Sequence, residues 1–272
     1  MESITITPDG EKLYVCSDRF VKVLRLSDGV VQTIDIRGLR RPNSLCISPD
    51  GEKLYVADEN SRINVLRFSG GVDTFDIEGL GELYAGLCLS PDGRELYVAD
   101  THNHRIQVLD SEDGTHIRTI DVKGNAERQI IFPHGICLSP DGSELYIADN
   151  DNDSVQVLES KDGTYIRVIG GKGNANGQFL GPSRICISQD GRKLYVADTS
   201  NHRVQVLESD GTHIQTIGVR GNADGQFIFP QGICLSPDGG ELYVADFGND
   251  RIQVFQVWLI LNFTLFHLLD FF

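Results

Sequence analysis

One phrase recurs six times along this chain of 272 residues, and its spacing restricts the fold more than any other feature. In its most regular copies it reads Ser-Pro-Asp-Gly, two variable residues, then Leu-Tyr-Val-Ala-Asp. Spacings of 41, 42, 49, 49 and 48 residues separate its glycines, which are Gly10, Gly51, Gly93, Gly142, Gly191 and Gly239. A period of roughly 40–50 residues with short strands and tight turns is typical of β-propeller blades.

Residues 183–230 show how one repeat is built. Two largely apolar segments, 185–187 and 193–197, flank a tight turn, and residues 203–207 and 212–217 alternate between polar and apolar. Four antiparallel strands bury both of their faces only by stacking against neighbouring sheets. We therefore predict an all-β, six-bladed β-propeller of four-stranded antiparallel blades. The blades are expected to start near Ser3, Ser44, Gly86, Gly135, Arg184 and Gly232.

The repeats fill residues 1–256, and we expect a single propeller domain without a linker or a second domain. The pattern stops after Val254, and residues 257–272 form an aberrant hydrophobic C-terminal tail that is short for a membrane span. Three interpretations of this tail stay open. It supplies the last strand of blade 6, it is a gene-model artefact or the edge of a longer protein, or it anchors the chain to a membrane or a partner.

The cysteines argue against disulfide bonds and for a reducing compartment. Five of the six occupy one register position in the predicted innermost strand, at Cys46, Cys88, Cys137, Cys186 and Cys234. Free cysteine packs as a small apolar residue where blades converge, and equivalent positions lie around a ring rather than face to face. We expect no disulfides and, without a signal peptide at the N-terminus, a cytoplasmic protein.

Several segments resemble NHL repeats. They are the Leu-Tyr-Val-Ala-Asp strand, residues 103–108 (Asn-His-Arg-Ile-Gln-Val), their copy at 201–206, and the loop 221–227 (Gly-Asn-Ala-Asp-Gly-Gln-Phe). The resemblance implies a six-bladed propeller. It also implies three kinds of function: the substrate-recognition part of ubiquitin ligases with zinc-binding N-terminal modules, single-stranded RNA binding on a basic face, and peptide-amidating lyases with an axial zinc ion. These residues include no zinc-binding N-terminal module, so a ligase role requires further sequence or a partner.

The net charge of −15 is divided unequally between the two predicted faces. The hairpin face carries the first-to-second and third-to-fourth strand turns, whose charges sum to −13. The loop face carries the second-to-third strand loops and the loops between blades, and the loops between blades sum to +3. Loops held by a rigid scaffold usually carry binding, so we place the binding surface on the loop face.

A carboxylate closes the second strand of most repeats, at Asp58, Asp100, Asp149, Asp198 and Asp246. Repetition in every blade is the wrong pattern for catalysis, which needs a few different residues converging on one place. We interpret these aspartates as turn caps. Each is expected to pair with the arginine that follows its loop, namely Arg62, Arg105, Arg203 or Arg251.

The metal signals are weak, and we predict no metal site, no cofactor and no catalytic residues. Among the histidines only His134 matches an axial position of a propeller lyase, while the corresponding sites hold Asn43, Ser183 and Gln231. Residues 149–154 read like the start of a calcium loop but lack the glycine and the glutamate that such a loop requires.

The leading hypothesis is a non-catalytic scaffold that binds a protein or peptide on the loop face. The candidate contacts are polar, basic or aromatic residues of that face, namely Arg40, Arg41, His102, His104, Asp151, Asp153, His202, Phe247 and Asp250. RNA binding through the same face is the first alternative, weakened by scarce aromatic side chains. A metal-dependent lyase or lactonase is the second alternative. Membrane binding is not expected.

Overall fold

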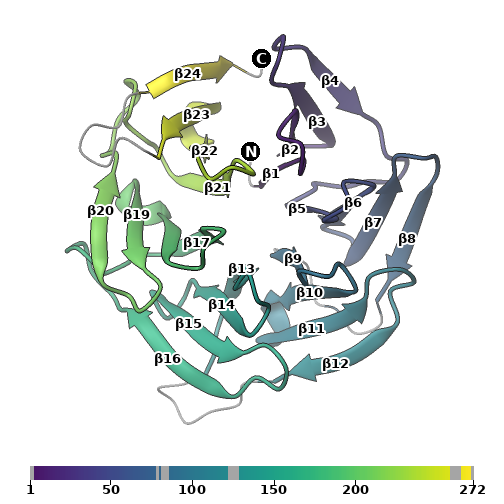
Figure 1. Ribbon diagram of the computed structural model, residues 1–272, viewed down its shortest axis with the longest axis horizontal. Coiled ribbons are helices and arrows are strands. Elements are labelled where there is room, and N and C mark those ends of the chain that lie inside the picture. The colour runs from purple at the N-terminus through teal and green to yellow at the C-terminus, as the bar shows by residue number, and fades with distance from the viewer. Residues whose placement is uncertain (1–2, 78–79, 81–85, 122–128, 258–264, 271–272) are drawn as a thin grey trace.

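The computed structural model arranges six four-stranded antiparallel sheets around a central axis, which confirms the predicted fold (Figure 1). The structure describes residues 3–77, 80, 86–121, 129–257 and 265–270, and for the last segment only its backbone. Within these residues the only helical elements are three short 3-10 turns.

Every blade follows the chain outward from the axis. The innermost strands are β1 (Ile4–Ile6), β5 (Ser44–Ile47), β9 (Leu87–Leu89), β13 (Pro133–Leu138), β17 (Pro182–Ile187) and β21 (Pro230–Leu235). The second strands are β2 (Lys12–Ser17), β6 (Lys53–Asp58), β10 (Glu95–Asp100), β14 (Glu144–Asp149), β18 (Lys193–Asp198) and β22 (Glu241–Asp246). The third strands are β3 (Phe20–Arg25), β7 (Arg62–Arg67), β11 (Arg105–Asp110), β15 (Ser154–Glu159), β19 (Arg203–Glu208) and β23 (Arg251–Gln256). The outermost strands are β4 (Val31–Ile34), β8 (Val72–Asp76), β12 (His116–Ile120), β16 (Tyr165–Gly170), β20 (His213–Ile217) and β24 (Leu265–Asp270).

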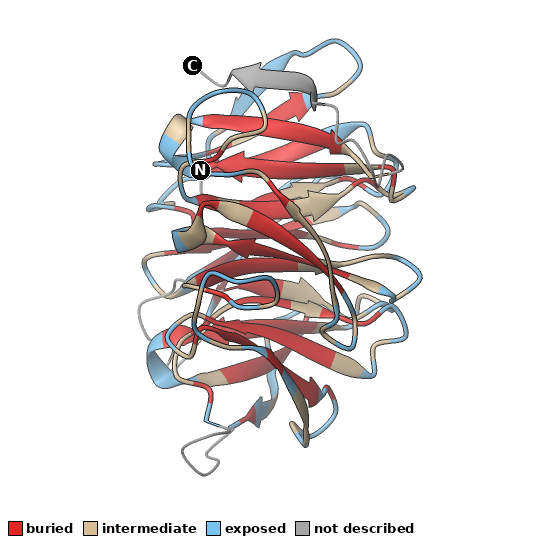
Figure 2. Ribbon diagram, turned by 90° about the vertical axis from the view of Figure 1, so that its left-hand side faces the viewer, coloured by how far each residue is buried: buried red, intermediate tan, exposed pale blue. Residues whose placement is uncertain are grey.

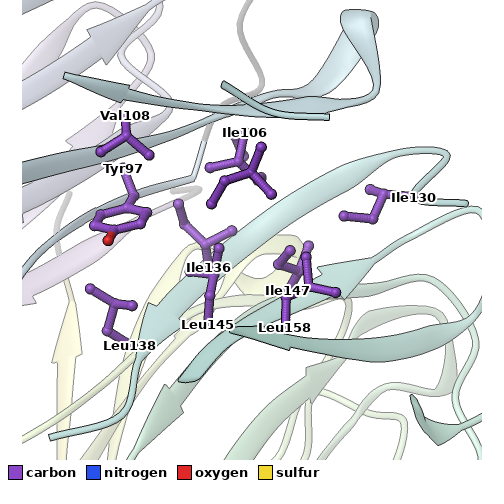
Figure 3. Close-up of a cluster of buried hydrophobic side chains, with 11 residues drawn as sticks. Tyr97, Ile106, Val108, Ile130, Ile136, Leu138, Leu145, Ile147 and Leu158 are labelled. Carbon is purple, nitrogen blue, oxygen red and sulfur yellow. The ribbon is translucent and has the colours of Figure 1, made fainter. Parts of the chain in front are cut away.

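The hydrophobic core lies between the blades. Where blades 3 and 4 meet, Tyr97, Ile106 and Val108 of blade 3 pack with Ile136 and Leu145 of blade 4 (Figure 3). Figure 2 shows the same division for the whole ring, with buried strands and exposed connecting loops. Each sheet thus buries both faces against its two neighbours. A single blade would leave both apolar faces exposed, so the blades are stable only together in the closed ring.

A chain of proline–glycine contacts runs around the hairpin face. The turn glycine of one blade has positive φ and lies against the turn proline of the preceding blade. A Cβ placed on these glycines would lie 3.1–3.5 Å from the proline Cδ, in the pairs Gly51–Pro8, Gly93–Pro49, Gly142–Pro91, Gly191–Pro140 and Gly10–Pro237. The sixth contact, from Gly239 of blade 6 to blade 5, is missing because the turn of blade 5 has Gln189 in place of proline. The side-chain amide of Gln189 instead donates a hydrogen bond to the carbonyl of Pro237 in blade 6.

Completing this ring is expected to stabilise the protein. Proline at position 189 would match the turn conformation of the other five copies and would restrict the unfolded chain, so Gln189→Pro should raise the free energy of unfolding by about 0.5 kcal/mol. Urea denaturation at pH 7 measures it. A loss of stability would mean that the bond from Gln189 to Pro237 outweighs the restricted turn.

The ring closes by packing of blade 6 on blade 1. All six sheets consist of consecutive strands, so no blade shares a strand from the opposite end of the chain. Ile4, Leu13 and Val15 of blade 1 pack with Tyr243 and Ile252 of blade 6. In the tail, β24 pairs antiparallel with β23 and occupies the outer edge of blade 6. The described residues contain no helix that is long and apolar enough to span a membrane.

All six cysteines are free thiols. The five in the innermost strands pack against the hydrophobic clusters between blades, and burial raises the pKa of Cys137 to about 12. These thiols remain protonated at neutral pH and therefore behave as small apolar side chains.

Candidate functional site

The second-to-third strand loops of the loop face share one backbone conformation. In three of them a 3-10 turn follows the second strand: η1 (Thr101–Asn103), η2 (Thr199–Asn201) and η3 (Phe247–Asn249). In blades 2 to 6 a residue with positive φ immediately precedes the third strand, at Ser61, His104, Asp153, His202 and Asp250. Asp and His adopt this left-handed region more readily than most residues do, which explains their choice here.

Three of the predicted binding residues use their side chains to hold the next loop between blades. Asp153 Oδ1 accepts a hydrogen bond from Gly181 N at 2.8 Å, and His202 Nδ1 accepts one from Phe229 N at 3.1 Å. A ring nitrogen of His104 bonds to the carbonyl of Ile131. All three side chains position the loops. Asp153 and His202 are buried and present little of themselves to a partner, whereas His104 is exposed.

The aspartates that close the second strands hold the loops from inside. Asp198 is fully buried and accepts hydrogen bonds from Leu180 N at 2.8 Å, Arg203 Nε at 2.7 Å and the Gln205 side-chain amide at 3.0 Å. Asn201 donates to both of its oxygens. The interpretation as turn caps is confirmed for this residue, and the carboxylate also ties the loop between blades 4 and 5 to blade 5.

The expected arginine pairs form in blades 3, 5 and 6. They are Arg105–Asp100 at 2.8 Å, Arg203–Asp198 at 2.7 Å and Arg251–Asp246 at 2.8 Å. In blade 2 the prediction is wrong, because Arg62 pairs with Asp76 at 2.7 Å. Asp76 stands opposite Arg62 in the register of β7 and β8, so a cross-strand partner replaces the one across the loop.

Two nearly identical loops, at 171–179 and 219–227, are built as rigid frames. In the first, Gly173 N donates to Phe179 O and Phe179 N donates to Gly171 O, at 2.9 Å each. Arg203 Nη2 donates to the carbonyls of Ala175 and Gln178, at 2.8 and 2.9 Å. Arg251 makes the same two contacts in the second loop, with Ala223 and Gln226. The outward side chains of both loops therefore stand on a fixed backbone.

Blade 4 lacks this arginine. Ser154 holds the position of Arg203 and Arg251, and burial raises the pKa of Asp149 above its usual value. Two backbone amides, Ile131 N and Phe132 N, and the Asn152 side chain donate to this carboxylate.

Ser154→Arg is therefore expected to stabilise the protein at neutral pH. The new guanidinium would pair with the buried Asp149 carboxylate and lower its pKa, with a gain of about 1 kcal/mol in the free energy of unfolding at pH 7. Urea denaturation of the variant beside Ser154→Met separates the charge from the added volume. If both variants destabilise the chain equally, blade 4 has no room for the arginine.

An aromatic and histidine arc lies on the outer surface of the same loops. The rings of His102 and Phe132 meet edge to face with centroids 5.6 Å apart, and those of His202 and Phe229 lie 4.5 Å apart. Phe229 and Phe247 are 43% and 39% exposed. Sequence reasoning missed Phe132 and Phe229. Their signal was the Phe-Pro pair that starts the innermost strand in both repeats.

The remaining candidates are exposed but differ in their contacts. Arg40 donates only its backbone N–H to Asp58, at 3.4 Å, which leaves its side chain on the surface. Arg41 pairs with Glu59 at 2.9 Å, and Lys172 lies 3.6 Å from Asp153. Asp151 and Asp250 are exposed. Two basic residues of the loops between blades, Arg41 and Lys172, thus pair with acids of the second-to-third strand loops.

The loop-face end of the axial channel is bridged by one arginine that the sequence analysis did not single out as functional. Arg184 is 7% exposed and stands where the other blades have glycine or serine. Its guanidinium donates to the carbonyl of His134 at 3.0 Å and to that of Asn43 at 2.6 Å. Asn43 precedes β5, on the opposite side of the axis from β17 (Figure 1). The channel encloses about 400 Å³.

His134 lies at the same end of the channel. Its Nδ1 is 3.1 Å from the carbonyl of Ser183, and burial together with the nearby Arg184 charge lowers its pKa to about 3. In the described part of the chain, no three His, Cys, Asp or Glu side chains are grouped as a metal site would require. Two of the three acids of the segment 149–154, Asp149 and Asp153, accept backbone hydrogen bonds, and the third, Asp151, is exposed.

Taken together, the candidates form one arc over blades 3 to 6 and one separate corner. His102 and Phe247 are exposed members of the arc, and the buried His202 packs on Phe229. His104, Asp153, His202 and Asp250 take the left-handed positions of these loops. Arg40 and Arg41 lie on the loop before blade 2, at another sector of the same face.

Known proteins resemble this chain in repeat and fold. The model of the NHL repeat matches residues 85–109, 179–207 and 227–255. A hydrazine synthase of Kuenenia stuttgartiensis superposes with a TM-score of 0.68 at 19% identity, over 94% of this chain and 95% of that one. A functionally unknown protein from Desulfotomaculum acetoxidans DSM 771 gives 0.68 at 17% identity, over 98% and 84%. These identities indicate shared fold alone. No curated protein sequence matches this chain.

Proposed function

We propose that this chain, a six-bladed β-propeller with NHL repeats, is a non-catalytic scaffold that binds a protein or peptide on its loop face. In a larger protein of the ubiquitin-ligase type, the same face would hold the substrate. The innermost strands of blades 2 to 6 each carry a free cysteine, which suits a cytoplasmic location.

One observation carries the proposal: the loops of this face are preorganised. The frames at 171–179 and 219–227 are bonded within themselves and are clamped by Arg203 and Arg251. Rigid loops lose little conformational entropy on binding, so contacts made by their exposed side chains translate more fully into affinity. Exposed aromatic rings on such loops are the usual anchors of protein interfaces.

A matched pair of variants tests the face. The loop-face variant combines Arg40→Glu, His102→Ala and Phe247→Ser. The control makes similar changes on the hairpin side of the ring and its outer edge, with Arg192→Glu, His116→Ala and Ile117→Ser. Immobilised parent and variants are compared by quantitative mass spectrometry of retained proteins, and direct partners are then confirmed by calorimetry with the purified protein.

The expected result is a partner that is retained by the parent and the control and is lost from the loop-face variant. With three contacts removed, the affinity should fall by about a hundredfold. A partner that binds all three proteins equally well would place the interface elsewhere and contradict the assignment of the loop face.

A further inference from the structure

The junctions between neighbouring blades differ in their polar groups, and among the described side chains only blades 3 and 4 carry an arginine clamp. On the hairpin face, blade 3 carries a clamp in which Arg118 donates to Glu95, to the hydroxyl of Tyr97 and to the carbonyl of Ser160 in blade 4. Blade 4 repeats it, with Arg167 bonded to Glu144, Tyr146 and the carbonyl of Ser209 in blade 5. These two junctions are thus lined by paired polar groups. Where blades 3 and 4 meet, Glu95, Tyr97 and Arg118 line a hollow of about 900 Å³ together with Asp92 and Asp141.

Blade 1 keeps the tyrosine of the clamp but has different residues at the other three positions, as does the junction of blades 5 and 6 with Lys193, Gln215 and Val257. Lys12 replaces the glutamate, Gln32 replaces the arginine, and Phe68 of blade 2 replaces the serine. Tyr14 keeps its place, but its hydroxyl has no hydrogen bond to any described residue. Its ring instead stacks on Phe68, with centroids 5.7 Å apart.

An open groove lined mainly by apolar side chains lies between blades 1 and 2. It has a volume of about 230 Å³, and Tyr14, Val23, Val30, Leu66 and Phe68 line it. Val30 and Phe68 are 43% and 41% exposed, which is unusual for large apolar side chains that stand beside each other. A volume below the usual range of small-molecule pockets suits a single side chain of a partner better than a free ligand.

The charge of the groove is opposite to that of its surroundings. Lys12 and Arg25 line it, and no acidic residue does. The turns around it belong to the acidic hairpin face. In the turns of blades 1 and 2, hydrogen bonds from the hydroxyls of Thr7 and Ser48 lower the pKa of Asp9 and of Asp50. A carboxylate would therefore be repelled from most of this face and attracted to this one place.

We propose that the groove between blades 1 and 2 docks a segment of a partner protein in which a large apolar side chain stands next to a carboxylate. The apolar side chain would enter between Tyr14 and Phe68, and the carboxylate would meet Lys12. Arg25 already pairs with Asp28 at 2.8 Å and contributes less. This surface lies on the opposite face from the proposed loop-face site and does not depend on it.

A phage-displayed library of random heptapeptides is the probe. The parent is compared with a filled variant, Lys12→Glu with Gln32→Arg and Phe68→Ser, which copies the clamp of blade 3. We expect the parent to enrich peptides that place Phe, Leu or Trp beside Asp or Glu, and the filled variant to retain them about tenfold less well. The single variant Lys12→Glu, which alters only an exposed side chain, should weaken binding about fivefold.

Two controls separate this site from others. Ile117→Ser removes another exposed apolar residue, on the outer strand of blade 3, and should change nothing. The loop-face variant described above should also bind the enriched peptides normally. The best peptide, made synthetically, should shift the methyl resonances of Val23 and Val30. The proposal is overturned if no such motif is enriched, if Lys12→Glu binds the peptides as well as the parent, or if the shifts map to the loop face.

Discussion

Asp198→Ala should lower the free energy of unfolding by about 3–5 kcal/mol, the usual cost of removing one partner from a buried ion pair. The carboxylate is fully buried, and it receives hydrogen bonds from Leu180 N, Arg203 Nε and the side chain of Gln205. Its loss leaves the half-buried arginine without a counter-charge and releases the loop that leads into blade 5. Urea denaturation followed by far-UV circular dichroism measures the change.

Glu208→Ala is the matched control for this experiment. It removes an exposed carboxylate from the end of β19, in the same blade, and should change stability by less than about 0.5 kcal/mol. Hydrogen exchange of the amides at 173–179 should accelerate in Asp198→Ala and stay unchanged in the control. Equal stability of the two variants would show that Asp198 does not hold the loop.

Acid is expected to destabilise the protein through His134. Burial, reinforced by the charge of Arg184, lowers the pKa of this imidazole to about 3 in the folded state, whereas the unfolded chain titrates near 6.5. Between these values the unfolded state binds the extra proton, so stability is lost as pH falls below about 6.5. The loss from this one group should reach about 2 kcal/mol by pH 5, before most carboxylates titrate.

His134→Gln isolates this contribution, because glutamine already occupies the equivalent place in blade 6 as Gln231. Free energies of unfolding of parent and variant are compared at half-unit steps from pH 7.5 to pH 5. The difference between them should change by roughly 1.4 kcal/mol per pH unit below pH 6.5, in favour of the variant. A difference that is independent of pH would mean that the folded protein accepts the proton at His134.

The architecture could be predicted from sequence because it depends on local signals repeated along the chain. Turn residues at fixed spacing and alternating third strands specify each blade, and stacking follows from their two apolar faces. The pair of Asp198 and Arg203 could be predicted for the same reason, since both residues belong to one loop and stand opposite each other in β18 and β19. Arg62 departed from this pattern because a neighbouring strand offered a closer acid.

The candidate site was harder to predict because its contacts join distant parts of the chain. His202 reads as a surface histidine in sequence, but its ring nitrogen accepts a bond from Phe229, 27 residues later. Arg184 reads as an irregular copy of a glycine position, and only the closed ring brings it to Asn43 across the axis. The groove at Tyr14 likewise depends on Phe68, a residue of the next blade. Periodicity gives no information about such pairs.

The clamps also disfavour strand exchange between two copies of this chain. The second strands are nearly interchangeable in sequence, so a folding chain could accept one from a neighbouring molecule or from the wrong repeat. Such a substitution would not be neutral. If β18 took the place of β10, Lys193 would stand where Glu95 now receives Arg118, and two cations would share a half-buried junction. Small sequence differences among the repeats thus favour the pairing of each strand with its own blade over pairing with another.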